Sequence, residues 1–324
     1  MGRIFSGIQP SGEITIGNYL GAIRNWVTLL EEHDSIFGIV DQHALTILYD
    51  QQEMQRRIFE AAAVNIAAGL DPAKCTLFVQ SHVPEHTELT WYFNTVTPMG
   101  ELGRMTQFKE KSKQHQDNIN VGLFDYPVLQ AADILLYKAD RVPVGEDQVQ
   151  HIELSREIAR KFNLRFGEIF PEPQAILSPT PRVLGLDGKA KMSKSMNNYI
   201  GVVEDPKSIR SKLATAVTDE NRKRRTDPGN PDICNLFTLH KSFSRQEQID
   251  MVDMECRRAG IGCVDCKKIL ADNMIEELTP IRERCQALQN EPDRVRDVLE
   301  RGADRCKKIA TETIDEVRRA MGLR

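Results

Sequence analysis

The sequence lacks long apolar runs, low-complexity stretches and any strong excess of charge of one sign. No segment reaches the ~20 apolar residues that a bilayer-spanning helix needs, and no basic region precedes an apolar stretch at the N-terminus. We therefore expect a cytoplasmic protein with no membrane span. The net charge of −4 means that a polyanionic partner would have to meet a local basic patch. The run Arg222 to Arg225 is one such patch, although such runs are also common in solvated loops.

The cysteines do not follow the pattern of a disulfide scaffold. Three of the seven are scattered, and the other four follow the spacing C-x21-C-x6-C-x2-C. In a reducing compartment such a group indicates metal binding before disulfides. Four thiolates suit either a tetrahedral zinc ion or a cubane iron–sulfur cluster, and ligand type alone does not separate the two. Four reduced, buried cysteines are the remaining alternative. The candidate ligands are Cys234, Cys256, Cys263 and Cys266.

The first third of the chain alternates β-branched runs with helical periodicity. Strands are expected at Arg3 to Ile8, Ser35 to Val40 and Thr76 to Gln80, with a helix over Gln51 to Leu70. A further apolar stripe with helical spacing follows the turn at Gln9 to Gly12; it consists of Ile16, Leu20, Ile23, Val27 and Leu30. This βαβαβ order predicts an α/β fold with a Rossmann-like parallel sheet.

The strands disappear in the last part of the sequence. A helix over Val128 to Tyr137 and a strand at Arg141 to Val144 are still expected, with a helical insertion around residues 105–140. Beyond about Asp205 the apolar residues follow helical spacing, despite Pro280, which should kink one helix. We therefore predict a Rossmann-like catalytic domain over residues 1–204 and a C-terminal helical domain over residues 205–324.

Two segments far apart in the sequence have the composition of phosphate-binding elements. The segment from Gln9 to Asn18 lies between the first strand and the first helix, where glycines allow close approach to a ligand and a helix start favours an anion. Alone it is more often an ordinary turn. The segment Lys191 to Ser195 follows a glycine-rich turn and carries two lysines suited to a polyphosphate, although a solvated lysine loop is the commoner fate of such a segment.

Together these segments carry a resemblance to a known family. The TIGN stretch at residues 15–18 and the KMSKS loop at residues 191–195 resemble the motifs of class I aminoacyl-tRNA synthetases. Several intervening segments are similar to the tryptophanyl members of that family: DQH at 41–43, MTQFKEKS at 105–112, YP at 126–127, AADIL at 131–135 and GEDQ at 145–148. The similarity runs over nearly the whole chain, from Phe5 to Leu323.

The resemblance implies ATP-dependent activation of L-tryptophan and its transfer to the 3′ end of tRNA(Trp). Activation needs in-line positioning and stabilisation of negative charge on the leaving pyrophosphate, with Mg²⁺ bound to the ATP. The implied catalytic residues are Lys191, Lys194, Lys111, Thr15 and Asn18, the last two at positions where many class I enzymes have histidines. The implied ATP-binding residues are Gln9, Pro10, Ser11, Gly17, Asn18, Gly145, Glu146, Asp147, Val183, Lys191, Met192, Ser193, Lys194 and Ser195.

Asp133 is the residue expected to recognise tryptophan. It lies on an otherwise apolar helix, where a carboxylate requires a donor such as an indole N–H, although a helix aspartate can also face water. The resemblance adds Phe5, His43, Tyr126 and Val144 around the substrate. It also adds Gln130, which stands where the family commonly has methionine, and Gln148 as a partner of the substrate ammonium group or of Asp133.

The resemblance also bears on the cysteines and on assembly. Some tryptophanyl synthetases carry a [4Fe-4S] cluster on a nearly identical cysteine spacing, so the cluster is the expected cofactor and zinc the alternative. Such a cluster could be structural or could present Arg257, Arg258, Lys267 and Lys268 to the tRNA anticodon. Family members are symmetric dimers, and a homodimer interface around residues 80–140 is expected by analogy.

Three other functions compete with this interpretation. A tyrosine-specific ligase would share the fold, but it would be expected to offer a site for a phenol hydroxyl in place of Asp133. An RNA- or nucleotide-binding regulator without catalysis would not need intact TIGN, KMSKS and GEDQ segments. An iron–sulfur redox protein would explain the cysteines but leave both KMSKS lysines without a role.

Overall fold

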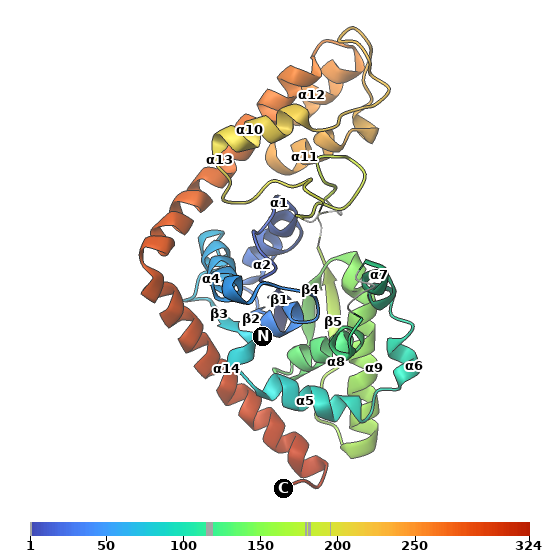
Figure 1. The fold of residues 1–324 in the computed structure, drawn as a ribbon, viewed down its shortest axis with the longest axis vertical. Coiled ribbons are helices and arrows are strands. Elements are labelled where there is room, and N and C mark those ends of the chain that lie inside the picture. Colours follow the sequence, from blue (N-terminus) through green and yellow to red (C-terminus); the bar gives the residue numbers. More distant parts are fainter. Residues whose placement is uncertain (1, 115–118, 179, 181–182, 195) are drawn as a thin grey trace. The chain divides into compact units, whose positions relative to one another are not determined.

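The chain folds into two compact units, and each is described by itself (Figure 1). The structure is a computed structural model that describes residues 2–114, 119–178, 180, 183–194 and 196–324. Unit 1 comprises Met1–Gly12, Asn25–Pro179 and Glu291–Arg324, and unit 2 comprises Glu13–Arg24 and Thr180–Asn290. The predicted functional boundary at 204/205 follows a different criterion and stays a prediction. Among the described residues, every helix is too short or too polar to cross a lipid bilayer.

Unit 1 is built on a five-stranded parallel sheet with the order β3-β2-β1-β4-β5. The strands are β1 (Arg3–Ile8), β2 (Asp34–Ile39), β3 (Cys75–Val79), β4 (Arg141–Val144) and β5 (Gln174–Leu177). The parallel sheet and the strands expected from the sequence are therefore confirmed, with shifts of one residue at β2 and β3. Strand β5 was not predicted, because its four residues, QAIL, are too few to give a clear strand pattern, and they are half-buried or exposed.

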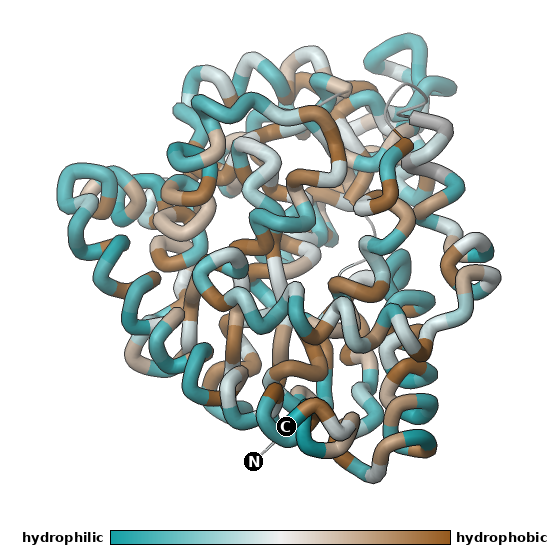
Figure 2. The backbone as a smooth tube through the Cα atoms, turned by 60° about the horizontal axis from the view of Figure 1, so that its bottom comes forward, coloured by the Kyte–Doolittle hydropathy of each residue, from teal (hydrophilic) through white to brown (hydrophobic). Residues whose placement is uncertain are grey.

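Unit 1 also contains the helices that connect its strands and, after the last strand, helix α14. They are α2 (Arg24–Leu29), α3 (Asp41–Ala44), α4 (Gln51–Ala67), α5 (Glu85–Asn94), α6 (Met99–Leu102), α7 (Thr106–Gln114), α8 (Val121–Leu135), α9 (Val149–Phe166), α14 (Pro292–Ala320) and the short 3-10 turns η2 (Gln80–His82) and η4 (Glu146–Gln148). Polar and apolar residues alternate around the turns of the long helices in Figure 2, as expected for helices with one buried face.

Helix α8 is the element that carries Asp133. It packs against α5 and α9, and its buried residues join a core that includes Phe93, Phe162 and Tyr137. The helix begins at Val121, seven residues before the predicted start, because the side chain of Asn120 caps it by accepting from the amide of Leu123. The helix continues through Pro127, which explains why the sequence underestimated its length.

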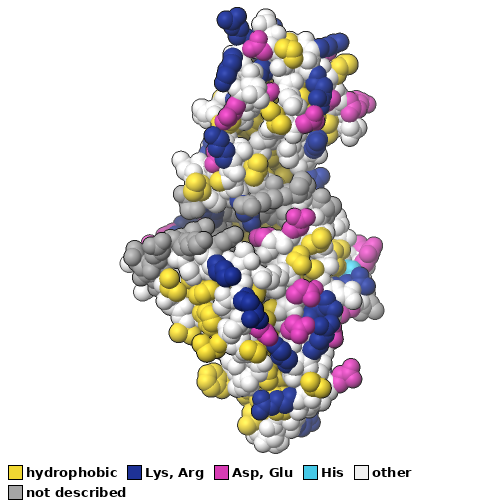
Figure 3. Space-filling model, turned by 90° about the vertical axis from the view of Figure 1, so that its right-hand side faces the viewer, with side chains coloured by type: hydrophobic (Ala, Val, Ile, Leu, Met, Phe, Trp, Pro, Cys, Tyr) yellow, Lys and Arg dark blue, Asp and Glu magenta, His cyan; other side chains and the backbone are white. Residues whose placement is uncertain are grey.

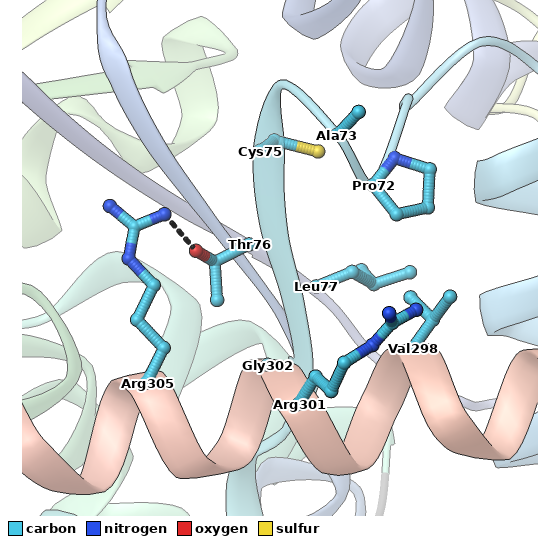
Figure 4. Close-up of a pocket in the computed structure, with 9 residues that line it drawn as sticks. All are labelled: Pro72, Ala73, Cys75, Thr76, Leu77, Val298, Arg301, Gly302 and Arg305. Carbon is cyan, nitrogen blue, oxygen red and sulfur yellow. Dashed lines mark hydrogen bonds between the residues drawn. The ribbon is translucent and has the colours of Figure 1, made fainter.

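Helix α14 covers the edge of the sheet at β3. Its Gly302 lies so close to this strand that a Cβ atom built there would be 2.0 Å from the carbonyl oxygen of Leu77. Figure 4 shows the two elements side by side, with Arg305 of the helix donating to Oγ1 of Thr76 at 2.7 Å. Arg305 also pairs with Asp34 of β2 at 2.7 Å. The helix thus protects an edge strand that would otherwise expose unpaired backbone groups.

Unit 2 is mainly helical. Its elements are α1 (Ile16–Asn18), the π-helical turn η1 (Tyr19–Ile23), α10 (Pro206–Thr215), the 3-10 turn η5 (Pro231–Ile233), α11 (Asn235–Phe243), α12 (Gln246–Arg257) and α13 (Cys263–Asn290). The single helix predicted over Ile16 to Leu30 is thus divided by η1. Helix α13 runs through Pro280 without ending.

Candidate active site

The candidate residues of unit 1 gather where parallel strands end. Gln9 follows β1, His43 lies just after β2, Gln80 follows β3, and residues 145–148 follow β4. These four strands are neighbours in the sheet, so their carboxyl ends lie at one edge. Open α/β sheets bind their ligands at this edge.

Asp133 is the centre of a buried hydrogen-bonded cluster at this edge. Its Oδ1 accepts from Nε2 of Gln80 at 2.7 Å and lies 2.6 Å from Nδ1 of His86. Its Oδ2 lies 2.7 Å from Nε2 of His43. Asp133 is only 1% exposed. The expectation of apolar surroundings is therefore wrong, because two imidazoles and an amide surround the carboxyl group.

These partners keep Asp133 ionised. Burial alone would raise the pKa of this carboxyl group, but the charges and hydrogen bonds of His43 and His86 outweigh it and lower the pKa to about 2. A carboxylate offers about four acceptor directions; Gln80 and His43 take one each by hydrogen bonds, and the ion-pair contact with Nδ1 of His86 takes a third. One direction remains, at Oδ2, for a further N–H donor.

An aromatic wall adjoins this carboxylate. The ring of Tyr126 lies 4.2 Å from the ring of His43, and its hydroxyl accepts from Nε2 of Gln9 at 2.9 Å. Burial raises the pKa of Tyr126 to about 12, so its hydroxyl stays protonated. Phe5, also buried, stacks on Tyr137 with ring centroids 5.6 Å apart. The structure therefore brings together Gln9, His43, Tyr126 and Asp133.

Gln130 and Gln148 have other partners than Asp133. Oε1 of Gln130 lies 2.5 Å from Nδ1 of His151, so the residue that departs from the family pattern is part of a polar pair. Nε2 of Gln148 donates to Oδ2 of its neighbour Asp147 at 3.3 Å. In the part of the chain that the structure describes, Gln80 and not Gln148 is the glutamine that bonds Asp133. Sequence reasoning missed Gln80, although its position directly after a buried strand was a usable signal.

The turn after β4 presents two carboxylates to solvent. Gly145 begins the η4 turn, and a Cβ atom on it would lie 2.8 Å from Oδ1 of Asp147. Glu146 and Asp147 are exposed, whereas Val144 packs against the core of unit 1. Exposed carboxylates beside a glycine are suited to accept from ribose hydroxyls.

In unit 2, the TIGN stretch forms a tight cap. Thr15 is 3% exposed, and its Oγ1 accepts from the amide of Asn18 at 3.3 Å. Oδ1 of Asn18 in turn accepts from the amide of Thr15 at 3.1 Å and from its hydroxyl at 2.9 Å. This capping box uses Oδ1 of Asn18 and leaves its Nδ2 group for another acceptor. Thr15 therefore shapes the turn, and Asn18 is the exposed member of the pair.

The KMSKS loop lies against the same stretch within unit 2. A Cβ atom on Gly17 would lie 3.5 Å from Cβ and 3.7 Å from Sδ of Met192, so the two motifs are in contact. The amide of Met192 donates to the carbonyl oxygen of Val183 at 3.2 Å, and both side chains are buried. Lys191 is exposed and Lys194 is half-buried. TIGN and the KMSKS loop are thus brought together within this unit. That both motifs bind one triphosphate stays a prediction.

Asn198, which sequence reasoning missed, organises the KMSKS loop. Its Oδ1 accepts from the amide of Ser193 at 2.8 Å, and its Nδ2 donates to Oδ2 of Asp187 at 2.8 Å. Gly185 makes room for it, because a Cβ atom there would lie 2.1 Å from Nδ2 of Asn198. A buried asparagine three residues past the motif was a weak sequence signal, since surface loops are rich in asparagine.

Some predicted residues cannot be placed in this way. Ser195 lies outside the described residues, and the side chain of Lys111 is likewise outside the description, although its backbone belongs to α7. Pro10 is buried, Gln9 is half-buried and Ser11 is exposed, in the turn that leaves β1.

The four candidate metal ligands face one another in unit 2. All are free thiols, and three of them pack around a small core of Phe237, Val252 and Ile261. Burial and the neighbouring Cys234, Cys256 and Cys263 raise the pKa of Cys266 to about 12. Among the described residues, however, no group of three or more His, Cys, Asp or Glu side chains is arranged to hold a metal ion.

Arg222 lies beside these thiols. Its Nη1 is 3.8 Å from Sγ of Cys256 and 3.9 Å from Sγ of Cys263, and its Nη2 donates to the carbonyl oxygen of Ile261 at 2.7 Å. The first arginine of the basic run is therefore held against the cysteines and is not a solvated side chain.

Comparisons with known proteins agree with this geometry. A family model described as tRNA synthetases class I (W and Y) matches residues 2–279. The tryptophan–tRNA ligase of Deinococcus radiodurans is 53% identical, with 99% of each chain covered. A tryptophanyl-tRNA synthetase of Campylobacter jejuni, solved with ADP and tryptophan, has a TM-score of 0.87 at 35% identity and covers 99% of this chain and 100% of its own. A tyrosyl-tRNA synthetase of Archaeoglobus fulgidus, at 21% identity and a TM-score of 0.70, shares the fold alone. The chain therefore belongs to the class I tRNA synthetases that comprise the tryptophan and tyrosine enzymes.

Proposed function

We infer that the chain is a tryptophan–tRNA ligase. It activates L-tryptophan with ATP to form tryptophanyl-adenylate and pyrophosphate, and then transfers tryptophan to the 3′ end of tRNA(Trp). The observation that carries this inference is the similarity over the full chain to curated tryptophan–tRNA ligases, at 53%, 48% and 44% identity. The buried Asp133 cluster adds a physical reason for tryptophan.

Asp133 would select tryptophan through the indole N–H. The free acceptor direction at Oδ2 belongs to an anion that three donors prevent from turning. A site built to bond one polar group rejects an analogue without that group by about 10⁴–10⁵-fold, because the buried acceptor is then left unpaired. Phenylalanine lacks the donor, and tyrosine would have to place its hydroxyl at a different distance from the ring. Phe5 and Tyr126 of the aromatic wall would hold the indole together with Gln130. Val144 would pack at the edge of the indole.

His43 is proposed to meet the amino-acid end of the substrate. Its Nε2 is committed to Asp133, while its Nδ1 is buried without a hydrogen-bond partner in the described part of the chain. A buried imidazole nitrogen in this state favours a polar ligand group. Gln148 remains a proposed contact of the substrate ammonium group.

The residues proposed to bind ATP are given for each unit by itself. Unit 1 contributes Gln9, Pro10 and Ser11 after β1 and Gly145, Glu146 and Asp147 after β4; unit 2 contributes Gly17, Asn18, Val183 and the KMSKS loop. The tryptophan carboxylate attacks the α-phosphorus, and the bond from this phosphorus to the β-phosphate breaks as pyrophosphate leaves with Mg²⁺. Lys111, Lys191 and Lys194 would stabilise the charge that moves onto the pyrophosphate. Ser193 and Ser195 would add donors in the same loop.

The helical unit would bind the tRNA. On the face drawn in Figure 3 basic and acidic side chains are interspersed, so the attraction for RNA must come from local groups. Arg257 and Arg258, on α12 and at its end, are exposed, and their partners are surface carboxylates such as Asp253 and Glu255. Exposed ion pairs contribute about 0–1 kcal/mol, so phosphates can replace them at little cost. We keep the division at 204/205 as the proposed boundary of tRNA-binding function.

We propose a [4Fe-4S] cluster on Cys234, Cys256, Cys263 and Cys266, with zinc as the alternative. The donor set is compatible with either group, because three of the four free thiols pack around one small core and the Arg222 guanidinium lies beside Cys256 and Cys263. A zinc ion would draw four sulfurs to about 2.3 Å from one centre. The cluster is larger, and it would serve as a structural cross-link in the tRNA-binding unit. Visible absorbance of anaerobically purified protein separates the two, since zinc gives a colourless sample.

A homodimer with an interface around residues 80–140 is proposed by analogy with the family. Exposed Trp91, Met99 and Val121 lie in this stretch and are candidates for burial between two copies. Sedimentation equilibrium of the purified chain tests this state. Since tRNA charging serves translation, we propose a cytoplasmic location.

The decisive experiment is ATP–pyrophosphate exchange with each aromatic amino acid in turn, followed by charging of tRNA. We expect exchange with tryptophan alone and charging of tRNA(Trp). Exchange with tyrosine, or with no aromatic amino acid, would show that the substrate is wrong. ATP–pyrophosphate exchange without charging of tRNA would show that the chain activates an amino acid but is not a tRNA ligase.

A further inference from the structure

A buried chain of polar groups continues from Asp133 away from the ligand. His86 of α5 places Nδ1 at 2.6 Å from Asp133 and Nε2 at 2.7 Å from the hydroxyl of Tyr137. The thiol of Cys306 on α14 lies close enough to the Tyr137 hydroxyl to help raise the pKa of this hydroxyl. His86, Tyr137 and Cys306 are all 0% exposed. Buried polar groups are costly, so a chain of this kind needs a reason.

The geometry fixes the imidazole of His86 on every side. Its ring is stacked on Phe78 with centroids 5.7 Å apart and meets the edge of Tyr137 at 5.4 Å. Both ring nitrogens have partners, and a partner on one nitrogen determines the role of the other. Because an ionised carboxylate can only accept, the Nδ1 of His86, 2.6 Å from Oδ1 of Asp133, carries a proton toward it.

We propose that His86 is a positioning residue for tryptophan recognition. It holds Asp133 as an anion in the one orientation that leaves Oδ2 available to the indole N–H, and Tyr137 holds His86 in turn. This inference rests on the proposed function, because it assigns a second layer to the same tryptophan site. His86 does not touch the substrate, so its effect must pass through the carboxyl group.

The charge state of Asp133 predicts how tryptophan affinity depends on pH. The groups that face it are His43 on α3, Gln80 on η2 and His86 on α5. Tyr126 on α8 lies nearby, and Tyr137 is influenced by Glu85 on α5 and Cys306 on α14. Desolvation disfavours the anion, and His86 is one of two residues that oppose it. Without His86 the carboxyl group takes up a proton at a higher pH, and tryptophan affinity is then lost as the pH falls.

The test is calorimetric titration of L-tryptophan from pH 5.5 to 8.5 into the full-length chain and three variants. His86→Leu removes the donor, His86→Gln returns one N–H group, and Tyr137→Phe removes only the hydroxyl. We expect His86→Leu to weaken tryptophan binding at pH 7 by at least about tenfold, as for loss of a hydrogen bond to a charged group. We also expect the affinity of His86→Leu to fall toward low pH, whereas that of the natural chain stays level. The tryptophan affinity of His86→Gln should recover part of the loss, and that of Tyr137→Phe should lie between the affinities of the natural chain and His86→Leu. In all three variants the KM for ATP should change less than about twofold.

His82→Leu is the matched control, because this exposed histidine of η2 lies four residues away and outside the cluster. Its binding should equal that of the natural chain. Equal affinity of His86→Leu and the natural chain overturns the proposal. So does a weaker His86→Leu whose pH profile stays level, since that result indicates packing alone. Asp133→Asn separates the two levels: if it weakens binding while the His86 variants do not, only the role of His86 fails. If Asp133→Asn binds tryptophan normally, the proposed recognition by Asp133 fails as well.

Discussion

Replacing Gly302 with alanine tests how α14 is seated on the sheet. Intrinsic helix propensity predicts that Gly302→Ala stabilises the helix by about 1 kcal/mol. The structure predicts the opposite sign. A Cβ atom there would lie 2.0 Å from the carbonyl oxygen and 2.8 Å from the carbonyl carbon of Leu77, and both atoms belong to the backbone of β3. No side-chain rotation relieves this contact, so the helix or the strand must shift.

The expected magnitude follows from the two opposing effects. Ordinary contacts of a Cβ atom begin near 3.4 Å, so the helix must move outward by more than an ångström over the site. Overpacking of this kind costs about 1–3 kcal/mol, and the propensity gain returns about 1 kcal/mol. The net loss is therefore up to about 2 kcal/mol, which lowers the melting temperature of a chain of this size by up to a few degrees. Cys306 lies one turn further along α14 and close to the Tyr137 hydroxyl, so tryptophan binding should weaken slightly as well.

Tryptophan fluorescence during thermal unfolding measures this effect without ligand. Both tryptophans of the chain, Trp26 and Trp91, belong to unit 1, which contains β3 and α14. Gly21→Ala is the control, because a Cβ atom on Gly21 meets nothing within 4 Å, and we expect its transition to be unchanged or higher. An increase of the melting temperature in Gly302→Ala would refute the close seating of α14 on β3.

Three further predictions concern catalysis, charge and metal. Lys194→Ala should lower kcat for pyrophosphate exchange by about 10²–10³-fold with little change in tryptophan affinity, because its charge is needed in the transition state; an equal loss in tryptophan binding would contradict this role. Burial opposes the ionisation of Asp34, but Arg3 and Arg305 outweigh it and lower its pKa. Asp34→Asn should therefore cost about 1 kcal/mol of unfolding free energy at pH 7, measured in urea. This difference should shrink as the pH falls below about 4 and vanish only below the lowered pKa of the folded state. Cys263→Ser should abolish bound iron and its visible absorbance while pyrophosphate-exchange activity persists; unchanged metal content would exclude this cysteine as a ligand.

Local patterns in the sequence were sufficient to predict the sheet. Strands β1 and β4 have the predicted bounds because apolar, β-branched residues are flanked by clear turn signals. The half-buried β5 and the early start of α8 were missed, since the first is stabilised by pairing with β4 and the second by a side-chain cap. Both depend on neighbours that a hydrophobic pattern does not contain.

The site was predictable to the extent that it lies in contiguous motifs. TIGN and KMSKS were recognised as segments in the sequence, and the structure shows the contact between them through Gly17 and Met192. The partners of Asp133 are 47, 53 and 90 residues away along the chain. Such partners come together only through the parallel arrangement of β2 and β3, so the polar character of this pocket could not be read from the helix that carries Asp133.

The buried carboxylate also explains why the unit retains polar groups where apolar ones would pack more easily. Replacing a buried charged cluster with apolar side chains is often neutral or stabilising, so the cluster around Asp133 is weak support for stability alone. Discrimination between aromatic amino acids needs an acceptor that can neither turn nor take up a proton. Gln80 and the two histidines meet the first requirement by direct bonds and the second by lowering the pKa of the carboxyl group to about 2. In the proposed recognition by Asp133, selectivity for an indole is thus a property of the whole cluster, and we expect substitutions in residues that never touch the substrate to alter it.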